Sequence, residues 1–394
     1  MDFSKMKSYL TILIFSVLFL AIGNRIAVRD SAAIPYDDEF SMIFVNAQVT
    51  EIIEHTVEDV GQGFSRTVIF FYARITRGVH RGEVVRAEQS FSDHILMQEL
   101  EVGLNDRVLL FYDDFTGFYY MAGHTRLHYV IVLGAVFFLL MLLFARGKGF
   151  NSVLSLIFIC AAIFLVFVPA ILSGGNIYLV TIIICLYAIL STLLMVIGAN
   201  KKALASILGC TGGVLLAGLL MFAMDRITKL TGFIDEETMW LTLLDNPIDI
   251  RAIIFAGVLI GALGAIMDVA MSISSSLWEL RKAGGVSDFK SIFASGMNIG
   301  KDIMGTMLNT LILAYIGSSL SLILLIVAHS TSFQLLFSME LIIVELLRAL
   351  VGSFGMLLAI PLTAAICAWL FIDTDADEYA LHFDDDTGTD FYDD

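Results

Sequence analysis

The sequence predicts an α-helical polytopic membrane protein with about eight transmembrane helices and a small β-barrel-like domain outside the membrane. Three observations favour this class. Hydrophobic residues make up 58% of the 394 residues and the mean hydropathy is +0.85, whereas soluble domains are about 45–50% apolar. Apolar runs of membrane-spanning length recur along the chain. After the first run comes a stretch of short apolar segments separated by turn residues, which is typical of strands.

The predicted crossings are apolar runs near the roughly 20 residues that span about 30 Å of hydrocarbon. Eight runs qualify: Ser8–Ile26, Leu127–Phe144, Val153–Leu172, Ile177–Ile197, Leu204–Met224, Ala252–Leu280, Ile303–Val327 and Val351–Ile372. Residues 1–29 therefore form an N-terminal anchor, and residues 127–372 form a core of seven helices. The first run also suits a cleaved signal peptide, since basic residues precede an apolar stretch that ends in small residues.

Basic residues indicate the orientation of these helices, because cytoplasmic loops are enriched in Lys and Arg. Four pairs fall at alternate ends of the predicted runs: Lys5 and Lys7, Arg146 and Lys148, Lys201 and Lys202, and Arg281 and Lys282. All four pairs lie on one side if every run crosses the membrane. The expected topology therefore has both termini in the cytoplasm.

Residues 30–126 are expected to form an extracytoplasmic β domain. Five short segments are rich in β-branched and aromatic residues: MIFVNAQVTEII, TVIFFYARIT, GEVVRAE, DRVLLFYDD and TGFYYMAG. Five strands in under 100 residues favour a small OB-like or SH3-like barrel. The segment lacks the basic aromatic surface of nucleic-acid readers. We therefore expect no nucleic-acid partner. The features of this segment are equally consistent with a docking module and with a structural cap.

The C-terminal segment 373–394 is expected to be a disordered acidic cytoplasmic tail. It holds ten of the carboxylates and no Lys or Arg, so the formal net charge of −16 falls to −6 without it. Such a segment repels itself and has little apolar surface to bury. Its DTDADE stretch resembles a calcium loop but lacks the glycine and the distal glutamate of that geometry.

Two of the predicted helices carry polar stripes, and these are the main functional signal. One stripe consists of Asp268, Ser272, Ser275, Ser276 and Glu279, and the other of Lys301, Asp302, Thr306, Asn309 and Thr310. Both follow helical spacing. A charged side chain at bilayer depth costs at least about 2.5 kcal/mol, so such groups normally face a bundle interior or a watery path. This pattern is typical of a transporter or channel.

Asp268 is the strongest candidate for a protonatable or cation-coordinating group, because burial lets a carboxyl group titrate near neutrality. The same stripe could instead connect helices by hydrogen bonds. The amide of Asn309 needs a polar partner at depth, and Asp268 is the expected one. The cationic complement is expected at Arg348, which could equally form an i,i+3 ion pair with Glu345 alone.

Motifs for other chemistry are absent from the sequence. There is no Ser-His-Asp pattern, Walker loop or HExxH, so we expect neither an enzyme nor a cofactor. His124 and His128 are two possible ligands without a third, too few for a metal site. The four cysteines lie in apolar runs and are expected to be buried rather than disulfide-bonded. Active transport without a nucleotide motif would use an ion gradient.

Three stretches of the chain resemble the bacterial YibE/F-like family of membrane proteins. They are MDVAMSISSSLWEL, SGMNIGKDIMGTMLNTLILAYIGSSL and ELLRALVGSFGMLLAIPLTA. The resemblance covers Leu127–Phe371, and the extracytoplasmic segment suits the longer YibE-type member. It implies a multipass protein of the bacterial cytoplasmic membrane. It also implies a YibF-type membrane companion, with a homo-oligomer as the alternative partner.

The layout is also similar, more faintly, to SecD/SecF and RND transporter cores. In those proteins intramembrane carboxylates couple proton flow to movement of an outer domain. Carried over, Asp268 corresponds to the helix-borne acid and Gly352–Pro361 to the last core span. This chain differs in its extra spans and in its smaller outer domain.

Together these observations predict a membrane permease or export-accessory protein coupled to a proton or cation gradient through Asp268. The expected pathway residues are Asp268, Ser272, Ser275, Glu279, Asp302, Thr306, Asn309, Thr310, Glu345 and Arg348. The alternative is a non-transporting membrane scaffold or sensor that docks an envelope partner through its β domain.

Overall fold

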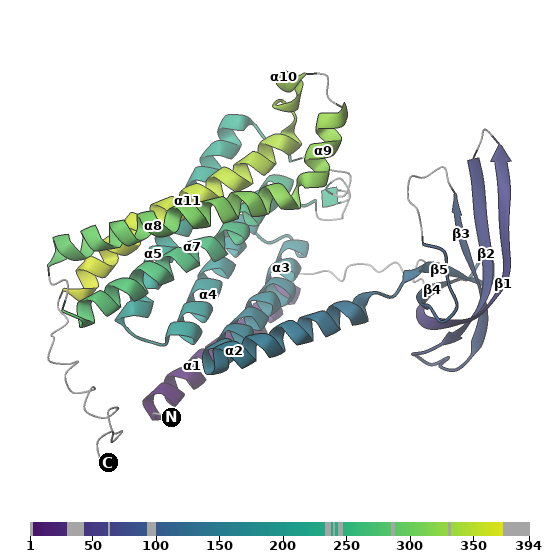
Figure 1. The fold of residues 1–394 in the computed structure, drawn as a ribbon, viewed down its shortest axis with the longest axis horizontal. Coiled ribbons are helices and arrows are strands. Elements are labelled where there is room, and N and C mark those ends of the chain that lie inside the picture. Colours follow the sequence, from purple (N-terminus) through teal and green to yellow (C-terminus); the bar gives the residue numbers. More distant parts are fainter. Residues whose placement is uncertain are drawn as a thin grey trace, which may run out of the picture. The chain divides into compact units, whose positions relative to one another are not determined.

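In its computed structural model the protein forms two compact units (Figure 1). The structure describes the chain except for residues 1–2, 30–42, 62–63, 93–99, 233–237, 239–240, 243–246, 285–287, 330–331 and 373–394. One unit comprises residues 33–144, and the other comprises residues 1–32 and 145–394. The predicted acidic tail lies outside the described residues.

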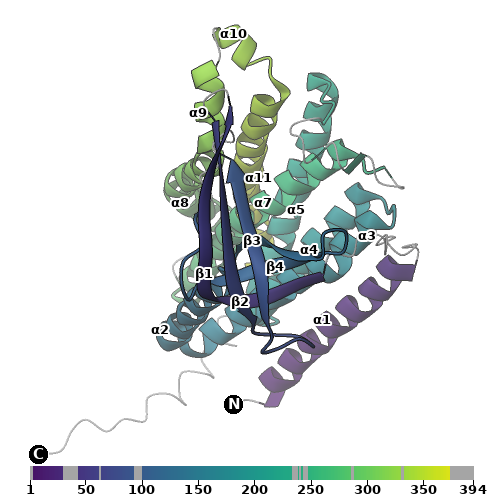
Figure 2. The same ribbon diagram turned by 90° about the vertical axis from the view of Figure 1, so that its right-hand side faces the viewer.

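The β domain is a closed five-stranded barrel, as the alternating segments of the sequence predict. Its strands are β1 (Ile43–Gly61), β2 (Phe64–Ile75), β3 (Val84–Ser92), β4 (Arg107–Asp113) and β5 (Phe118–His124). They follow the order β1-β2-β3-β5-β4, and β4 closes the barrel on β1. Strands β3 and β5 are parallel, and the other pairs are antiparallel. This non-sequential order agrees with the OB-like alternative, a Greek-key barrel. Figure 2 shows β1 and β2 as a long ribbon.

The barrel core consists of side chains that alternate along the strands with exposed ones. Val49, Phe71 and Leu110 come from three strands and are at most 1% exposed. The buried Gln89 side chain closes the loop after β3, since its amide donates to Leu100 O at 3.0 Å and accepts from Val102 N at 2.9 Å. The donor and the acceptor of this buried amide therefore both have partners.

The other unit is helical. Its first helix is α1 (Phe3–Arg29). Helix α2 (Leu127–Ala162), which begins in the unit of the barrel, continues through a π turn (Ile163–Phe167) into α3 (Val168–Leu172). The remaining helices are α4 (Ile177–Ile197), α5 (Lys201–Thr228), α7 (Ile250–Lys282), α8 (Phe289–Ser318), α9 (Leu320–His329), α10 (Phe333–Leu336) and α11 (Glu340–Phe371).

Seven stretches within the described helices are long and apolar enough to cross a membrane. They are Tyr9–Val28, Leu127–Ala145, Gly149–Leu172, Ile177–Ile197, Lys201–Thr228, Ile250–Lys282 and Glu340–Phe371. They correspond to seven of the eight predicted crossings. The other prediction, Ile303–Val327, falls on α8 and α9. Helix α8 has 30 residues, so its length suffices, but Lys301, Asp302 and Asn309 lower its hydropathy.

One local expectation of the topology differs from the structure. The sequence predicts a reversal of the chain near Arg146 and Lys148, between the second and third apolar runs. Helix α2 instead continues through these positions without a turn. The segment ARGKGF contains no proline, and its two glycines weaken a helix without breaking it. The basic residues Arg146 and Lys148 indicated a cytoplasmic loop, whereas the backbone of this segment is helical.

Side-chain caps define where the helices of the bundle begin. Asn176, Asn200, Asp249 and Asp288 precede α4, α5, α7 and α8, and each side chain accepts a hydrogen bond from a backbone N–H of the first turn. These residue types satisfy N–H groups that have no partner within the helix. The helix starts are thus encoded locally in the sequence.

Helix α11 packs against α5, α7 and α8 and forms the centre of this unit (Figure 1). Close approach depends on small residues, as is usual between membrane helices. A Cβ at Gly213 of α5 would lie 2.8 Å from the Ala359 Cβ of α11. Ser206 and Ser274 link α5 to α7 through hydroxyls 2.5 Å apart. This core leaves α7 and α8 each with one outward face.

Candidate functional site

The outward face of α7 is a continuous line of small and polar residues, which we call the α7 seam. It consists of Gly257, Gly261, Gly264, Asp268, Ser272, Ser275 and Glu279. The glycines, Asp268 and Glu279 are exposed, and the two serines are half-buried. The opposite face of the same helix carries Ile266, Ile273 and Leu277, which are fully buried. The polar stripe predicted from the sequence is therefore real, and it lies on the surface of the helical unit.

Asp268 has no hydrogen bond or ion pair among the described residues. Its neighbours along the seam are small, and a Cβ at Gly264 would meet nothing within 4 Å. The hydrogen bond expected between Asp268 and Asn309 does not form. Asn309 is exposed on α8 and Asp268 on the seam, so each side chain points outward rather than across the helix contact.

The outward face of α8 is polar as well, and we call it the α8 face. It consists of Asn298, Lys301, Asp302, Gly305, Thr306, Asn309, Thr310, Leu313 and Gly317, all of them exposed. The hydroxyls of Thr306 and Thr310 donate to carbonyls of their own helix, Ile303 O and Thr306 O, each at 3.0 Å. Lys301, Asp302 and Asn309 have no side-chain partner in the described part of the chain.

Helices α7 and α8 are neighbours. A Cβ at Gly261 would lie 2.9 Å from Tyr315 Oη of α8, and one at Gly300 of α8 would lie 3.4 Å from Ile273 Cδ1. These contacts fix the antiparallel register of the two helices. Between them, Asp268 lies level with the stretch of α8 around Gly305. The predicted pathway residues of α7 and α8 thus lie on the outward faces of two neighbouring helices.

Glu345 and Arg348 form the i,i+3 ion pair that their spacing predicts, with Nη1 and Oε1 2.5 Å apart. The other carboxylate oxygen accepts from the Ser319 hydroxyl at 2.6 Å, which ties α11 to the end of α8. Arg348 Nε and Tyr315 Oη are buried without a hydrogen-bond partner among the described residues. The pair is therefore a structural link as well as a candidate pathway group.

A further link near this end was not predicted. The Glu340 carboxylate accepts hydrogen bonds from Thr231 N at 2.7 Å, from the Thr231 hydroxyl at 2.6 Å and from Gly232 N. It holds the turn after α5 against the start of α11. More than 100 residues separate the partners, so local sequence patterns carry no signal for this contact.

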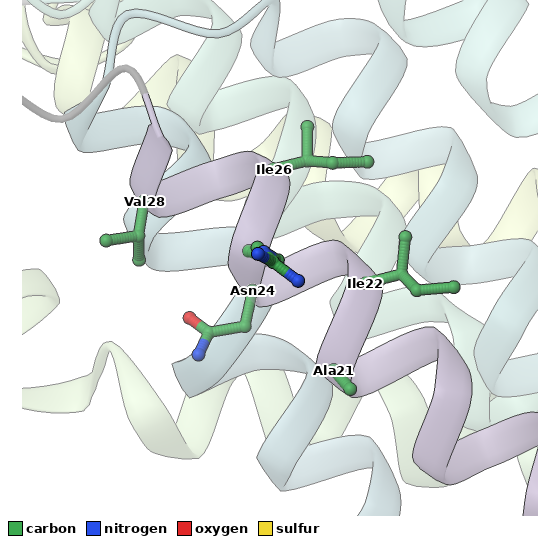
Figure 3. A pocket seen from close by; sticks show the side chains of 6 residues that line it. Ala21, Ile22, Asn24, Ile26 and Val28 are labelled. Carbon is green, nitrogen blue, oxygen red and sulfur yellow. The ribbon is translucent and has the colours of Figure 1, made fainter.

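Two of the hollows on the described surface lie along α7 and α1. Ser275, Ser276 and Glu279 line an open depression of about 510 Å³ where α7 ends. A second hollow, of about 760 Å³, is lined by α1 residues including Asn24 and Arg25 (Figure 3). The first belongs to the α7 seam, and the second contains no convergent set of titratable groups.

The described residues contain no cluster of three or more His, Cys, Asp or Glu side chains that could hold a metal ion. His124 lies 3.7 Å from Asp106 in the barrel. Among the cysteines, Cys185, Cys210 and Cys367 are buried as expected. Cys160 is exposed on α2, contrary to expectation, because that helix has few neighbours to cover it.

The comparison with protein families identifies the helical region. The description YibE/F-like protein matches residues 133–373, more than half of the chain. The protein belongs to the YibE/F-like family. This match contains α4 to α11 with both polar faces, and it excludes the barrel strands. The protein is therefore a YibE/F-like multipass membrane protein. No curated protein and no solved structure matches the chain, so the SecD/SecF layout stays a hypothesis.

Proposed function

We propose that this YibE/F-like protein is a bacterial cytoplasmic-membrane permease or export-accessory protein, coupled to a proton or cation gradient through Asp268. In this proposal α8 crosses the membrane and the barrel is extracytoplasmic. The protein needs no cofactor and is not an enzyme.

The observation that carries the proposal is the unpartnered carboxylate of Asp268 on the α7 seam. In hydrocarbon an ionised group without a partner is costly, and an unsatisfied polar group normally lines a cavity or a protein contact. The neighbouring residues are glycines and serines, which leave room for water or an ion beside the carboxylate. Asp268 would therefore exchange a proton or bind a cation on a wetted surface.

The remaining polar groups extend this route in both directions. Ser272, Ser275 and Glu279 continue the seam toward the end of α7 that carries Arg281 and Lys282. On α8, Asp302, Thr306, Asn309 and Thr310 provide oxygen and amide groups beside it. Hydroxyl and carboxylate oxygens can coordinate hard cations, and they can also form hydrogen bonds with water that carries protons. The Glu345–Arg348 pair lies beyond Tyr315, at the opposite end of the route.

Flux measurements in proteoliposomes test the proposal. With a pH or cation gradient imposed, Asp268→Asn should abolish gradient-driven flux, because the amide cannot release a proton or neutralise a cation. Asp268→Glu should retain part of it. The matched control is Asp288→Asn, which makes the same chemical change outside the predicted crossings and keeps a good helix cap. Unchanged flux in Asp268→Asn would remove the proposal.

The second candidate is a scaffold or sensor, and a row of aromatic rings on the barrel favours it. Phe44, Phe111 and Tyr120 lie side by side across β1, β4 and β5, with ring centroids 6.3 and 5.6 Å apart. Phe44 is 54% exposed. If cells that carry Phe44→Ser fail to grow under stress while cells that carry Asp268→Asn grow, docking explains the role of the protein better than transport does.

A further inference from the structure

The α8 face presents charges and amides that have no partner among the residues the structure describes. Lys301 and Asp302 are adjacent in sequence, and side chains at i and i+1 do not face each other on a helix. Neither has an ion-pair partner among the described residues, and both are exposed. Exposed polar groups on a membrane helix face a neighbouring helix or water rather than lipid. Either water or a neighbouring helix therefore lies against this face.

We propose that the α8 face is the contact surface between two copies of this chain, related by a two-fold axis along the membrane normal. In this arrangement Gly305 lies at the closest approach of the two helices. Lys301 of each copy meets Asp302 of the partner subunit, and the two Asn309 amides hydrogen-bond to each other.

The positions of these residues around the helix carry the proposal. At about 100° per residue, Asn298, Gly305 and Asn309 lie close to one line along α8. Lys301 projects to one side of that line and Asp302 to the other. A two-fold axis parallel to the helices brings the Lys301 side of one copy onto the Asp302 side of its partner. Two ion pairs then form at once, which is the self-complementarity of an isologous contact.

The other residues of the face fit the same arrangement. Nothing lies within 4 Å of the place that a Cβ at Gly305 would take, so the backbone of a second helix can approach there. An amide both donates and accepts hydrogen bonds, so Asn309 can pair with its own copy. A different partner chain would have to supply an acid and a base at matching heights, whereas a second copy supplies both.

This inference rests on α8 crossing the membrane, as in the proposed function, but it does not require transport. The two can fail separately. Asp268 lies on α7 rather than on the central line of the α8 face, so Asp268→Asn should leave the dimer intact while it abolishes flux. A dimer without gradient-driven flux would overturn only the proposed function.

Charge reversal in two differently tagged full-length chains tests the contact. Lys301→Glu makes the face wholly acidic, and Asp302→Lys makes it wholly basic. Wild-type copies should co-purify in mild detergent, and each variant should lose most co-purification with itself. Co-expression of the two variants should restore it, because each acidic face then meets a basic one. Asp288→Asn in both chains is the control and should co-purify as the wild type does.

Disulfide trapping provides a measurement that does not depend on the charged residues. In a Cys160→Ser background, Gly305→Cys should form a covalent dimer of the full chain in membranes under mild oxidation. Leu208→Cys, on the exposed side of α5, is the matched control and should not. Cross-linking of Gly305→Cys to a different membrane protein would overturn the two-copy contact. So would charge-reversal variants that co-purify with themselves as well as they do with each other.

Discussion

The barrel and the helical unit differ in whether their polar side chains have hydrogen-bond partners. In the barrel, Phe71 is fully buried while its neighbour Tyr72 is 39% exposed, and the buried Gln89 has hydrogen bonds at both ends of its amide. On α7 and α8, Asp268, Lys301 and Asn309 lie outward with no partner among the described residues. The buried amide of the barrel is thus satisfied by the barrel's own backbone. The helical unit needs water or another protein at its polar surface.

The largest expected effect is the loss of barrel stability when a buried ring is removed from its core. Phe71→Ala should destabilise the barrel by about 3–5 kcal/mol, because a large ring leaves a cavity in a packed core. Phe44→Ala is the matched control: its ring is 54% exposed, so the cost should stay below about 1.5 kcal/mol. Pulse proteolysis of the full-length protein across a urea series measures both. Equal losses would contradict the assigned core.

A smaller effect separates the two kinds of glycine in the helical unit. Gly213→Val should cost about 1–3 kcal/mol, since its Cβ would lie 2.8 Å from Ala359 Cβ at a tight helix contact. Gly264→Val makes the same change on the α7 seam, where a Cβ meets open space. Helix propensity affects both equally, so thermal unfolding in detergent should show a lower Tm for Gly213→Val. The reverse order would mean that the seam is packed and not open.

The smallest effect is a pH dependence at the start of α8. The Ser291 side chain and backbone N–H hold the pKa of Asp288 below its ordinary value of 3.8. Because the folded pKa is lowered, the carboxylate stabilises the helix start above about pH 3.8, and this contribution is lost as the pH falls through the lowered value.

Hydrogen exchange measures that dependence. Protection of the Ser291 and Ile292 amides should decline below about pH 4 in the wild type. In Asp288→Asn it should stay flat, because an amide caps the helix without titrating. Parallel declines in both proteins would show that another group controls this helix start.

The sequence determined the features that depend on neighbouring residues. Alternation predicted the five strands, and seven of the eight predicted apolar runs correspond to helical stretches of spanning length. Both succeed because burial on one or both faces repeats with the period of the element. The spacing of Asp268, Ser272 and Glu279 predicted their common helix face. The i,i+3 spacing of Glu345 and Arg348 predicted their ion pair. The resemblance to the YibE/F-like family was confirmed over residues 133–373.

Only the tertiary structure decided which way each helix face points. Helical spacing places Asp268 and Asn309 on polar faces, but it cannot say whether those faces meet, because their orientation depends on how α11 fills the centre of the bundle. The same holds for Glu340 and the turn at Thr231, which are far apart in sequence. Residues that meet through packing leave no periodic signal along the chain, whereas residues that share one helix or strand do.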